Sequence, residues 1–412
     1  MNQFLSSSLI LTLFLASTTS AAAVKRDGSY SKIHRLAIGP SLRNGVIELD
    51  RTMRKYGIEP PQELRDAATK QLNAITSGAA PSTSGDPGVG GGTKSGSVVA
   101  SPMLHNQEYL CPVTVGGQTL NLDIDTGSAD LWLFNTALPA SDQTGRTVYD
   151  SAKSSTFQKT TGSTFGVNYG DGSQTYGTVG TDTVEVGGIS VPGQSIELPT
   201  AVSATFTKDT NMDGILGLAY HQANTIRPTQ QLTFFENALS QLQAPVFTAN
   251  LKAGSAGAYQ FGFIDSTAYS GTLQYTPLIQ STSTVGLWAF EANPGTNASP
   301  AIADTGSSLL LLDDDIVRAY WAPVPGHTSD VQGITFPCNV QLPDFKIKLG
   351  DYTATISGSL LNYSPAMEAG YCFGGIQSNL GQGINVLGDV MFASQFVVFD
   401  KGQNRIGFAP HA

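Results

Sequence analysis

From Ser95 to the C-terminus, short apolar runs alternate with turn residues. The runs are rich in Val, Ile, Thr, Phe and Tyr, and Gly, Asn, Asp and Ser separate them, as in TYGTVGTDTVEVGGISV over residues 175–191. Such alternation predicts β-strands, with another strand at residues 108–115, EYLCPVTV. Helical periodicity is clearest at residues 229–242 and at residues 313–322, where leading acidic residues suit a helix N-terminus. The pattern indicates an all-β body.

Two stretches of this body place acidic residues among apolar neighbours. Residues 122–134 read LDIDTGSADLWLF and residues 301–312 read AIADTGSSLLLL, so Asp304 lies 179 residues after Asp125. Each stretch is followed by an apolar pair and a glycine, in DGILGLAY and in INVLGDVMF. The repeat predicts two related β lobes, each presenting one aspartate on a tight turn.

A single DTGS sequence would be explained by an aspartate turn between two strands. Two copies in matching apolar settings favour another interpretation, because burying an acid costs free energy unless the acid is paired. We therefore expect Asp125 and Asp304 to face each other and to share a proton.

The residues that precede the body differ from it in composition. Residues 1–22 read as a signal peptide, with the apolar run LILTLFLAS and small residues suited to cleavage, although no basic residue precedes Lys25. The run is far shorter than the roughly 20 residues that span a bilayer, so no membrane anchor is expected. Residues 77–97 contain seven glycines and predict a flexible linker and a cleavage zone.

Charge divides the chain at the same place. Up to Lys94 there are 11 Lys and Arg against 7 Asp and Glu, and from Ser95 onward there are 11 against 25. The basic front is a candidate partner for the acidic body. An acidic body argues against nucleic acid binding, which needs Lys and Arg to neutralise phosphates. It suits a protein that works in acid, where fewer carboxylates are ionised.

The three cysteines are Cys111, Cys338 and Cys372. In an exported chain we expect Cys338 and Cys372 to form a disulfide, which leaves Cys111 as a buried free thiol. A reactive role for Cys111 is the weaker interpretation, because no basic residue flanks it in the sequence.

Taken together, these motifs resemble the pepsin family of aspartic endopeptidases, in particular its secreted fungal type. The resemblance covers residues 95–412, with both DTGS sequences, NYGDGS, DGILGLA, the spacing of the last two cysteines and VLGDVMFASQFVVFDKGQNRIGFAP. It implies an all-β, bilobal fold with the active-site cleft between lobes at residues 95–280 and 281–412. Residues 23–94 would be a basic propeptide.

The resemblance implies that Asp125 and Asp304 are the catalytic pair and hold one water. One carboxylate takes a proton from the water while the other acid polarises the scissile carbonyl, and no covalent adduct forms. The supporting residues would be Ser128 and Ser307 on the outer carboxylate oxygens, Thr126 and Thr305 between the loops, and Gly127 and Gly306 beside the substrate. Ordinary turn packing stays the alternative for the threonines.

The hairpin around Tyr169 resembles the family's flap, which closes over the peptide. Trp132 matches the residue whose indole meets that tyrosine, although such a tryptophan is more often part of a core. Gly170, Asp171 and Ser173 would also contact the substrate. Asp171 would let the pocket before the cleaved bond accept lysine as well as large apolar side chains, and a plain turn residue is the alternative.

The resemblance also implies a zymogen. Lys55 would pair with the two aspartates and Tyr56 would block a pocket until acid weakens the attraction between front and body; a folding aid alone is the alternative. Cleavage after Lys94 would release the body. We expect secretion rather than a vacuolar destination, with glycan candidates at Asn297 and Asn362, whose sequons are each followed by proline.

Other enzyme classes fit poorly. The chain has no GxSxG or HExxH motif, and its five histidines lack ligand spacing, so neither a metal nor a cofactor is expected. Expected partners are protein and peptide substrates and the chain's own propeptide, in a monomer that binds neither nucleic acid nor membrane. A catalytically dead member that binds proteins is the alternative, and hydrolysis of a denatured protein at acid pH distinguishes the two.

Overall fold

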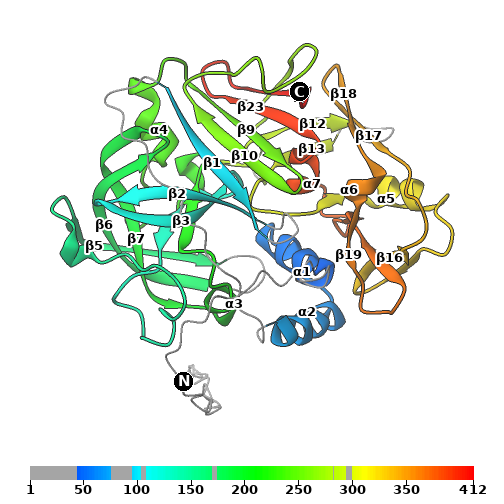
Figure 1. The fold of residues 1–412 in the computed structure, drawn as a ribbon, viewed down its shortest axis with the longest axis horizontal. Helices are drawn as coiled ribbons and strands as arrows, with labels where there is room; N and C mark the ends of the chain where they lie inside the picture. The colour runs from blue at the N-terminus through cyan, green and yellow to red at the C-terminus, as the bar shows by residue number, and fades with distance from the viewer. Residues whose placement is uncertain (1–43, 76–94, 104–107, 169–173, 282, 294–298) are drawn as a thin grey trace, which may run out of the picture. The chain divides into compact units, whose positions relative to one another are not determined.

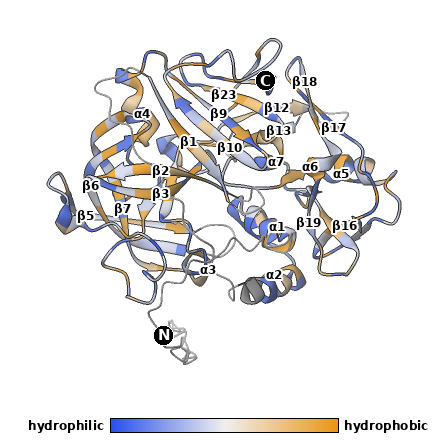
Figure 2. Ribbon diagram, in the orientation of Figure 1, coloured by the Kyte–Doolittle hydropathy of each residue, from blue (hydrophilic) through white to orange (hydrophobic). Residues whose placement is uncertain are grey.

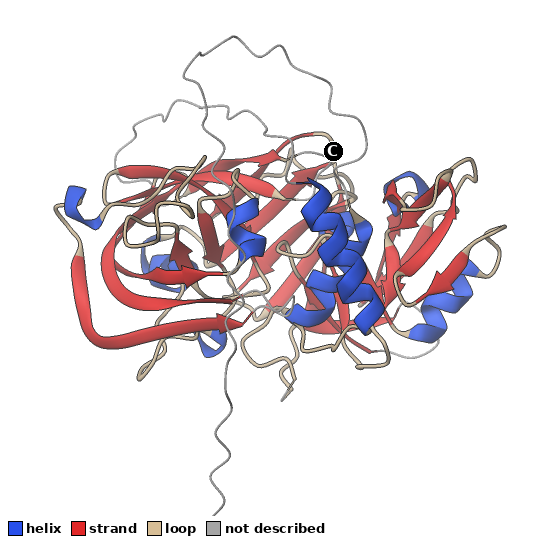
Figure 3. Cartoon of the chain, turned by 90° about the horizontal axis from the view of Figure 1, so that it is seen from below, coloured by secondary structure: helices blue, strands red, loops and turns tan. Residues whose placement is uncertain are grey.

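The computed structural model describes residues 44–75, 95–103, 108–168, 174–281, 283–293 and 299–412. Strands are the predominant regular structure of this part of the chain, as Figure 3 shows, which confirms the predicted all-β class. The predicted signal peptide lies outside the described residues, as do Lys94 and nearly all of the linker. Within the described residues, no helix has both the length and the apolar character needed to cross a membrane.

The largest sheet of the described chain contains thirteen strands. They are β1 (Gly96–Pro102), β2 (Tyr109–Val115), β3 (Gln118–Asp125), β4 (Leu131–Leu133), β5 (Gln158–Asn168), β6 (Gln174–Val186), β7 (Ile189–Val202), β8 (Gly214–Gly217), β9 (Val246–Lys252), β10 (Ser255–Phe261), β11 (Gln274–Pro277), β23 (Gln395–Asp400) and β24 (Arg405–Pro410). Their order is β11-β24-β23-β9-β10-β1-β2-β3-β8-β4-β7-β6-β5, and β2 also pairs with β6. The last two strands of the described residues thus pair with β9 and β11, in the same sheet as β1 and β2 (Figure 1).

Two smaller sheets lie in the second half of the chain. The first contains β12 (Ala289–Asn293), β13 (Ser299–Ala303), β14 (Leu310–Leu312), β17 (Phe345–Leu349), β18 (Tyr352–Ile356), β21 (Ile376–Ser378) and β22 (Asn385–Leu387), in the order β18-β17-β12-β13-β22-β14-β21. The second contains β15 (Thr328–Asp330), β16 (Gly333–Pro337), β19 (Asn362–Pro365) and β20 (Tyr371–Gly374), in the order β15-β16-β20-β19.

The predicted repeat appears as a repeated arrangement of strands. β3 runs parallel to β8, with Asp125 opposite Gly217, and β4 runs antiparallel to β8. In the second half, β13 runs parallel to β22 and β14 runs antiparallel to it. A Cβ on Gly217 would lie 2.6 Å from Asp130 N, and one on Gly388 would lie 2.3 Å from Ser307 O. Only glycine therefore lets each of these strands pass so close to its aspartate turn.

The helices of the described chain are mostly short. They are α1 (Gly45–Lys55), α2 (Gln62–Ile75), α3 (Ala204–Lys208), α4 (Phe234–Ala238), α5 (Asp314–Trp321), α6 (Gly358–Leu361) and α7 (Asp389–Phe392), with 3₁₀ turns η3 (Ser151–Lys153), η4 (His221–Ala223) and η5 (Leu239–Gln241). The prediction at residues 313–322 is confirmed by α5. The prediction at residues 229–242 is wrong in extent, because Thr233 and Glu236 form a capping box that starts α4 there, and η5 replaces its continuation.

The front segment, residues 44–75, consists of α1 and α2. The Asn44 side chain caps α1 by accepting hydrogen bonds from the N–H groups two and three residues further on, at 3.1 and 3.2 Å. Arg54 and Lys55 in the last turn complement the negative end of the helix dipole. α1 packs beside β16, β19 and β20 (Figure 1), so the front segment is part of the folded body.

Burial follows the predicted alternation along the strands. In β17 Phe345, Ile347 and Leu349 are buried while Lys346 and Lys348 are exposed, and Figure 2 shows the mixture of apolar and polar residues along the strands. In β17 this alternation places one face of the strand in the core, whereas β8 and β23 are buried along their whole length.

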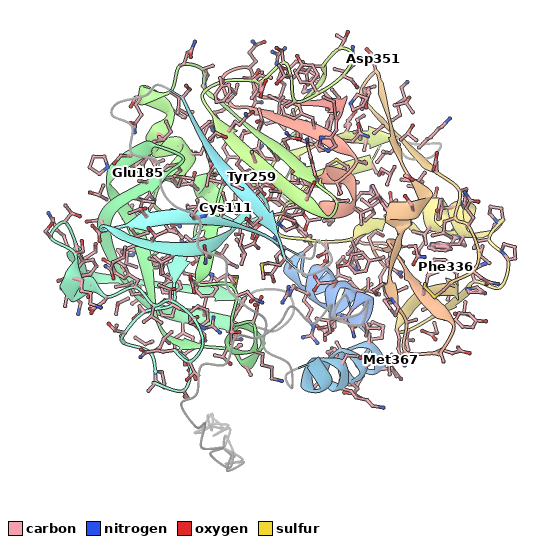
Figure 4. The ribbon with its side chains drawn as sticks, in the orientation of Figure 1. Cys111, Glu185, Tyr259, Phe336, Asp351 and Met367 are labelled. Carbon is pink, nitrogen blue, oxygen red and sulfur yellow. A yellow bond between two sulfur atoms is a disulfide. The ribbon has the colours of Figure 1, made fainter. Side chains whose placement is uncertain are left out.

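The predicted disulfide is confirmed between Cys338 and Cys372, whose Cα atoms lie 4.9 Å apart. Cys111 is a free thiol buried on β2, and it lies near Tyr259 in the middle of the view in Figure 4. Burial raises the pKa of the Cys111 thiol well above its ordinary value, with a further contribution from Asp123. An unreactive core residue is what this environment favours.

Candidate active site

Asp125 and Asp304 occupy equivalent positions at the ends of parallel strands. Asp125 is the last residue of β3, and Asp304 directly follows β13 and donates its N–H to Leu387 O at 3.1 Å. Both side chains are buried, with exposed fractions of 2% and 0%. The two turns face each other, because a Cβ on Gly127 would lie 2.4 Å from Asp304 Oδ1 and one on Gly306 would lie 2.4 Å from Asp125 Oδ1.

Each carboxylate accepts hydrogen bonds from its own turn. The inner oxygens accept from glycine N–H groups and the outer oxygens from serine hydroxyls: Gly127 N to Asp125 Oδ1 at 2.8 Å, Ser128 Oγ to Asp125 Oδ2 at 2.6 Å, Gly306 N to Asp304 Oδ1 at 3.0 Å, and Ser307 Oγ to Asp304 Oδ2. These donors orient both carboxyl groups before any ligand arrives.

A pair of threonines joins the two turns beneath the aspartates. Thr126 N donates to Thr305 Oγ1 at 3.2 Å and Thr305 N donates to Thr126 Oγ1 at 3.0 Å. Each hydroxyl also donates across the interface, from Thr126 to Ala303 O at 2.9 Å and from Thr305 to Ile124 O at 2.6 Å. These two threonines, called here the threonine lock, tie the two halves of the site together through four buried hydrogen bonds.

The last residue of α1 reaches both aspartates. Lys55 Nζ lies 2.8 Å from Asp125 Oδ1 and 2.9 Å from Asp304 Oδ1. The neighbouring Tyr56 hydroxyl donates to Asp304 Oδ2 at 2.7 Å. Lys55 is thus brought to both aspartates, and Tyr56 bonds one of them directly.

The pKa values of the two acids move in opposite directions. For Asp304, burial raises the pKa, but Lys55 and the hydroxyls of Ser307 and Tyr56 outweigh burial and hold it below its ordinary value. For Asp125, burial outweighs Lys55 and raises the pKa. Burial disfavours the Lys55 ammonium, yet the two carboxyl groups raise its pKa above the ordinary value. The cluster therefore holds a charged lysine between one carboxylate and one acid that protonates more readily.

A cavity of about 40 Å³ lies beside Asp125. Phe206, Met212 and Ile215 form an apolar wall of this cavity. Glu108, Asp123 and Asp209 form another part of its lining, called the acidic wall. Burial raises the pKa of Asp123 well above its ordinary value, with a further contribution from Asp125. The pKa of Glu108 is raised in the same way, by burial and then by Asp209.

A cation of the front segment lines this cavity. The Arg51 guanidinium lies 3.7 Å from Glu108 Oε1 and 3.5 Å from Glu48 Oε1, and the Ser308 hydroxyl donates to Glu48 Oε2 at 3.1 Å. Sequence reasoning missed Glu48, Arg51, Glu108 and Asp209 as members of the site. The spacing of Glu48 and Arg51 by three residues was the available signal, since it places both on one side of a helix.

Several expected site residues are not described. Tyr169, Gly170, Asp171, Ser173 and Asn297 lie outside the described residues.

The two remaining expected positions are described. Trp132, on β4, is fully buried among Phe134 and Phe206, with ring centroids 5.3 and 5.0 Å away. Asn362 begins β19 and is exposed, as a glycan acceptor requires. No group of three or more His, Cys, Asp and Glu side chains arranged to hold a metal ion occurs in the described part of the chain.

Two aspartates brought together from equivalent turns of two related β lobes define an aspartic peptidase. The family model for eukaryotic aspartyl proteases matches residues 108–411. The chain belongs to the eukaryotic aspartyl protease family and is a hydrolase of the aspartic endopeptidase class.

Individual relatives agree with this assignment. The chain is 46% identical over 326 residues to penicillopepsin-1 of Penicillium janthinellum, covering 77% of this chain and 99% of the relative. It is 42% identical over 386 residues to aspergillopepsin-1 of Aspergillus oryzae, covering 91% and 89%. The crystal structure of the aspartic proteinase from Irpex lacteus matches the fold with a TM-score of 0.63 at 23% identity, covering 77% of this chain and 98% of that one.

Proposed function

We propose that this chain is a secreted aspartic endopeptidase, made as a zymogen, that hydrolyses protein substrates at acid pH through a water molecule activated by Asp125 and Asp304. The observation that carries the proposal is the position of Lys55 Nζ, within 2.8 and 2.9 Å of the two inner carboxylate oxygens. A single small polar group that bonds both acids fits between them. Once Lys55 leaves, a water molecule of similar size takes its place.

The reaction follows from the closeness of the two acids, which cannot both ionise readily after Lys55 has left, so that one is a carboxylate while the other stays protonated. The ionised carboxylate removes a proton from the bound water, and the protonated acid donates a hydrogen bond to the scissile carbonyl oxygen. Water attacks the carbonyl carbon and gives a tetrahedral intermediate, and the same acids return protons as the amide nitrogen leaves. Ser128 and Ser307 hold the outer oxygens in place throughout.

The cavity beside Asp125 supports broad specificity. Phe206, Met212 and Ile215 offer an apolar surface for a large side chain. Asp123 in the acidic wall supplies a hydrogen-bond acceptor for a substrate ammonium, so lysine is accepted there as well as leucine or phenylalanine. Arg51 of the front segment occupies the neighbourhood that such a substrate cation would use. Asp171 is proposed as a second acid over the same pocket.

The front segment is proposed as the inhibitory part of a propeptide that ends near Lys94. Lys55 and Tyr56 support this role because their bonds to the dyad exclude the water and the substrate. Secretion is supported by the apolar residues at the start of the chain and by the disulfide, since disulfides persist in oxidising compartments. The active form is proposed to be a monomer, with Asn297 and Asn362 as glycan acceptors.

The test replaces each aspartate by asparagine. Asp125→Asn and Asp304→Asn should each lower kcat for casein at acid pH by at least about 10³-fold, because an amide can neither take the proton nor share one. Asp351→Asn is the matched control, since Asp351 is exposed on the turn between β17 and β18 (Figure 4) and should leave activity unchanged.

Near-UV circular dichroism checks that the variants fold. Substantial turnover by either folded variant would refute the dyad. Absence of turnover in the wild type, with retained binding of casein, would instead favour a protein-binding member of the family.

A further inference from the structure

Two further acids are buried against each other beneath the Asp125 turn. Asp130 precedes β4 and Glu197 lies on the parallel neighbour β7, opposite Trp132 in the ladder. Each is 1% exposed, and one amide nitrogen, Asn224 Nδ2, lies 3.0 Å from Asp130 Oδ1 and 3.4 Å from Glu197 Oε1, which places the two carboxyl groups side by side. Two carboxylates in contact in a buried site repel each other, so a proton between them is required for this geometry.

The hydrogen-bond donors around the two acids indicate which of them carries the proton. Asp130 Oδ1 accepts three hydrogen bonds, from Asn224 Nδ2 at 3.0 Å, Thr225 N at 2.8 Å and Thr225 Oγ1 at 3.1 Å. Glu197 Oε1 accepts one long bond from Asn224 at 3.4 Å, and its buried Oε2 has no donor among the described residues. Arg227, whose guanidinium donates to backbone carbonyls, is a cation whose charge also acts on Asp130. Asp130 therefore has the surroundings of a carboxylate and Glu197 those of a neutral acid.

Backbone hydrogen bonds connect this pair to the active site. Gly217 N donates to Asp130 O at 2.9 Å, and Ala219 N donates to Ser128 O at 2.9 Å. Gly217 is also the ladder partner of Asp125, and the Ser128 hydroxyl bonds Asp125 Oδ2. A shift of Asp130 is thereby transmitted to the groups that orient the catalytic carboxylate.

We propose that Glu197 is a positioning residue whose shared proton with Asp130 holds the Asp125 turn in place, and that loss of this proton toward neutral pH opens the turn and sets the upper pH limit of the active fold. The proposal goes beyond the reaction proposed above. Only its activity readout depends on that reaction.

The pKa shifts of Glu197 and Asp130 determine how this pair changes the stability of the fold with pH. Burial raises the pKa of Glu197 well above its ordinary value of 4.5, with a further contribution from Asp130. Burial also raises the pKa of Asp130. The folded state therefore binds more protons than the unfolded state. The contribution of this pair to stability is complete below about pH 4.5 and is lost as the pH rises through the raised pKa of Glu197.

The test compares Glu197→Gln with Glu185→Gln. Glutamine keeps the shape, stays neutral and donates an N–H to Asp130, so half-inactivation of the acid-treated enzyme should move upward by about one pH unit or more. Glu185 is exposed on the adjacent strand β6 (Figure 4), so its variant should inactivate at the same pH as the wild type. Residual activity is assayed at pH 4 relative to each variant's own starting value, and near-UV circular dichroism separates loss of the fold from self-digestion.

Two further measurements cover the case in which Glu197→Gln does not fold. Asp130→Asn should produce the same upward shift. In the wild-type full chain, hydrogen exchange between pH 4 and 7.5 should accelerate first in peptides covering residues 125–133, 194–199 and 217–227. An unshifted inactivation pH in a folded variant, or exchange that accelerates equally in both lobes, would overturn the proposal.

Discussion

Asp123 and Asp125 lie two residues apart on one face of β3, and their side chains have different neighbours. Asp125 accepts bonds from its glycine and serine and faces Asp304. Asp123 pairs with Leu110 across the sheet and lines the cavity beside the dyad. The acid at the end of the strand is thus the one proposed to act on water, and the acid two residues earlier is the one proposed to contact the substrate side chain.

Replacing Asp123 by asparagine should change selectivity more than catalysis. For peptides with lysine before the cleaved bond, kcat/KM should fall about tenfold, because a charge-assisted hydrogen bond is lost. Peptides with leucine there should keep their kcat/KM within about twofold. Parallel assays of the two peptides at one pH give the ratio, and an equal loss for both would show that Asp123 supports the site without reading the substrate.

Residues adjacent in the sequence were the easiest to predict. The two DTGS turns carry their own serines and glycines, so the orientation of both carboxylates could be inferred from four consecutive residues. Asp130 and Glu197 come from segments 67 residues apart, and neither residue is unusual in its own segment. The same holds for Glu108 and Asp209 in the acidic wall. Such pairs depend on which segments become neighbours in the fold, and no local sequence pattern records this.

At the scale of elements, the threonine lock is the feature that joins two separately folded turns. Thr126 is fully buried, and its hydroxyl both donates to Ala303 O and accepts from Thr305 N. Each half of the lock is supplied by one copy of the repeat, so neither copy completes its site alone.

Replacing Thr126 by valine should destabilise the protein by about 2 kcal/mol, because Thr305 N–H and Ala303 O are left without partners in the core. Urea unfolding of the full chain, followed by tryptophan fluorescence, measures the change. Thr353→Val is the matched control, since Thr353 is exposed on β18 and should change stability by less than about 0.5 kcal/mol. Equal effects of the two substitutions would mean that the lock contributes nothing specific.

Strands and helices differed in how well the sequence predicted them. Alternation located β2 and the β6–β7 hairpin because one face of each strand is buried. The segment at residues 229–242 has helical spacing throughout, yet Thr233 starts the helix four residues late by capping it. A side chain that competes for backbone N–H groups can therefore override a periodic pattern.

At the scale of the whole molecule, the front segment and the body are coupled through charge. In the form described here, with Lys55 bound between the two aspartates and called the closed form below, the pKa of Asp304 is below its ordinary value of 3.8. Lys55 is the main cause of this lowering. The stabilisation from this pair is therefore present above pH 3.8 and is lost as the pH falls through the lowered pKa. Glu108 and Asp123 have raised pKa values and act in the opposite sense, since they favour the closed form at low pH.

Replacing Lys55 by glutamine should let the front segment leave at a higher pH. The full chain is incubated at pH values from 2 to 7, and loss of the front segment by cleavage near Lys94 is followed on gels. The pH at which half of the chain is cleaved should rise by about one unit. Lys70→Gln is the control, because Lys70 is exposed on α2 and should leave the midpoint unchanged. If the Lys55→Gln variant lost the front segment at the same pH as the wild type, contacts other than those of Lys55 would hold the segment in place.

The order of strands in the largest sheet has a consequence for synthesis. β23 and β24 are the last two strands of the described residues, yet β23 pairs with β9, placing Val397 opposite Ala249. This sheet can therefore be completed only after residues 395–410 have left the ribosome. β22, which supports Asp304, also emerges late, at residues Asn385–Leu387. The turn that carries Asp304 therefore cannot take its final place beside Asp125 until residues 385–387 have been made, long after both aspartates.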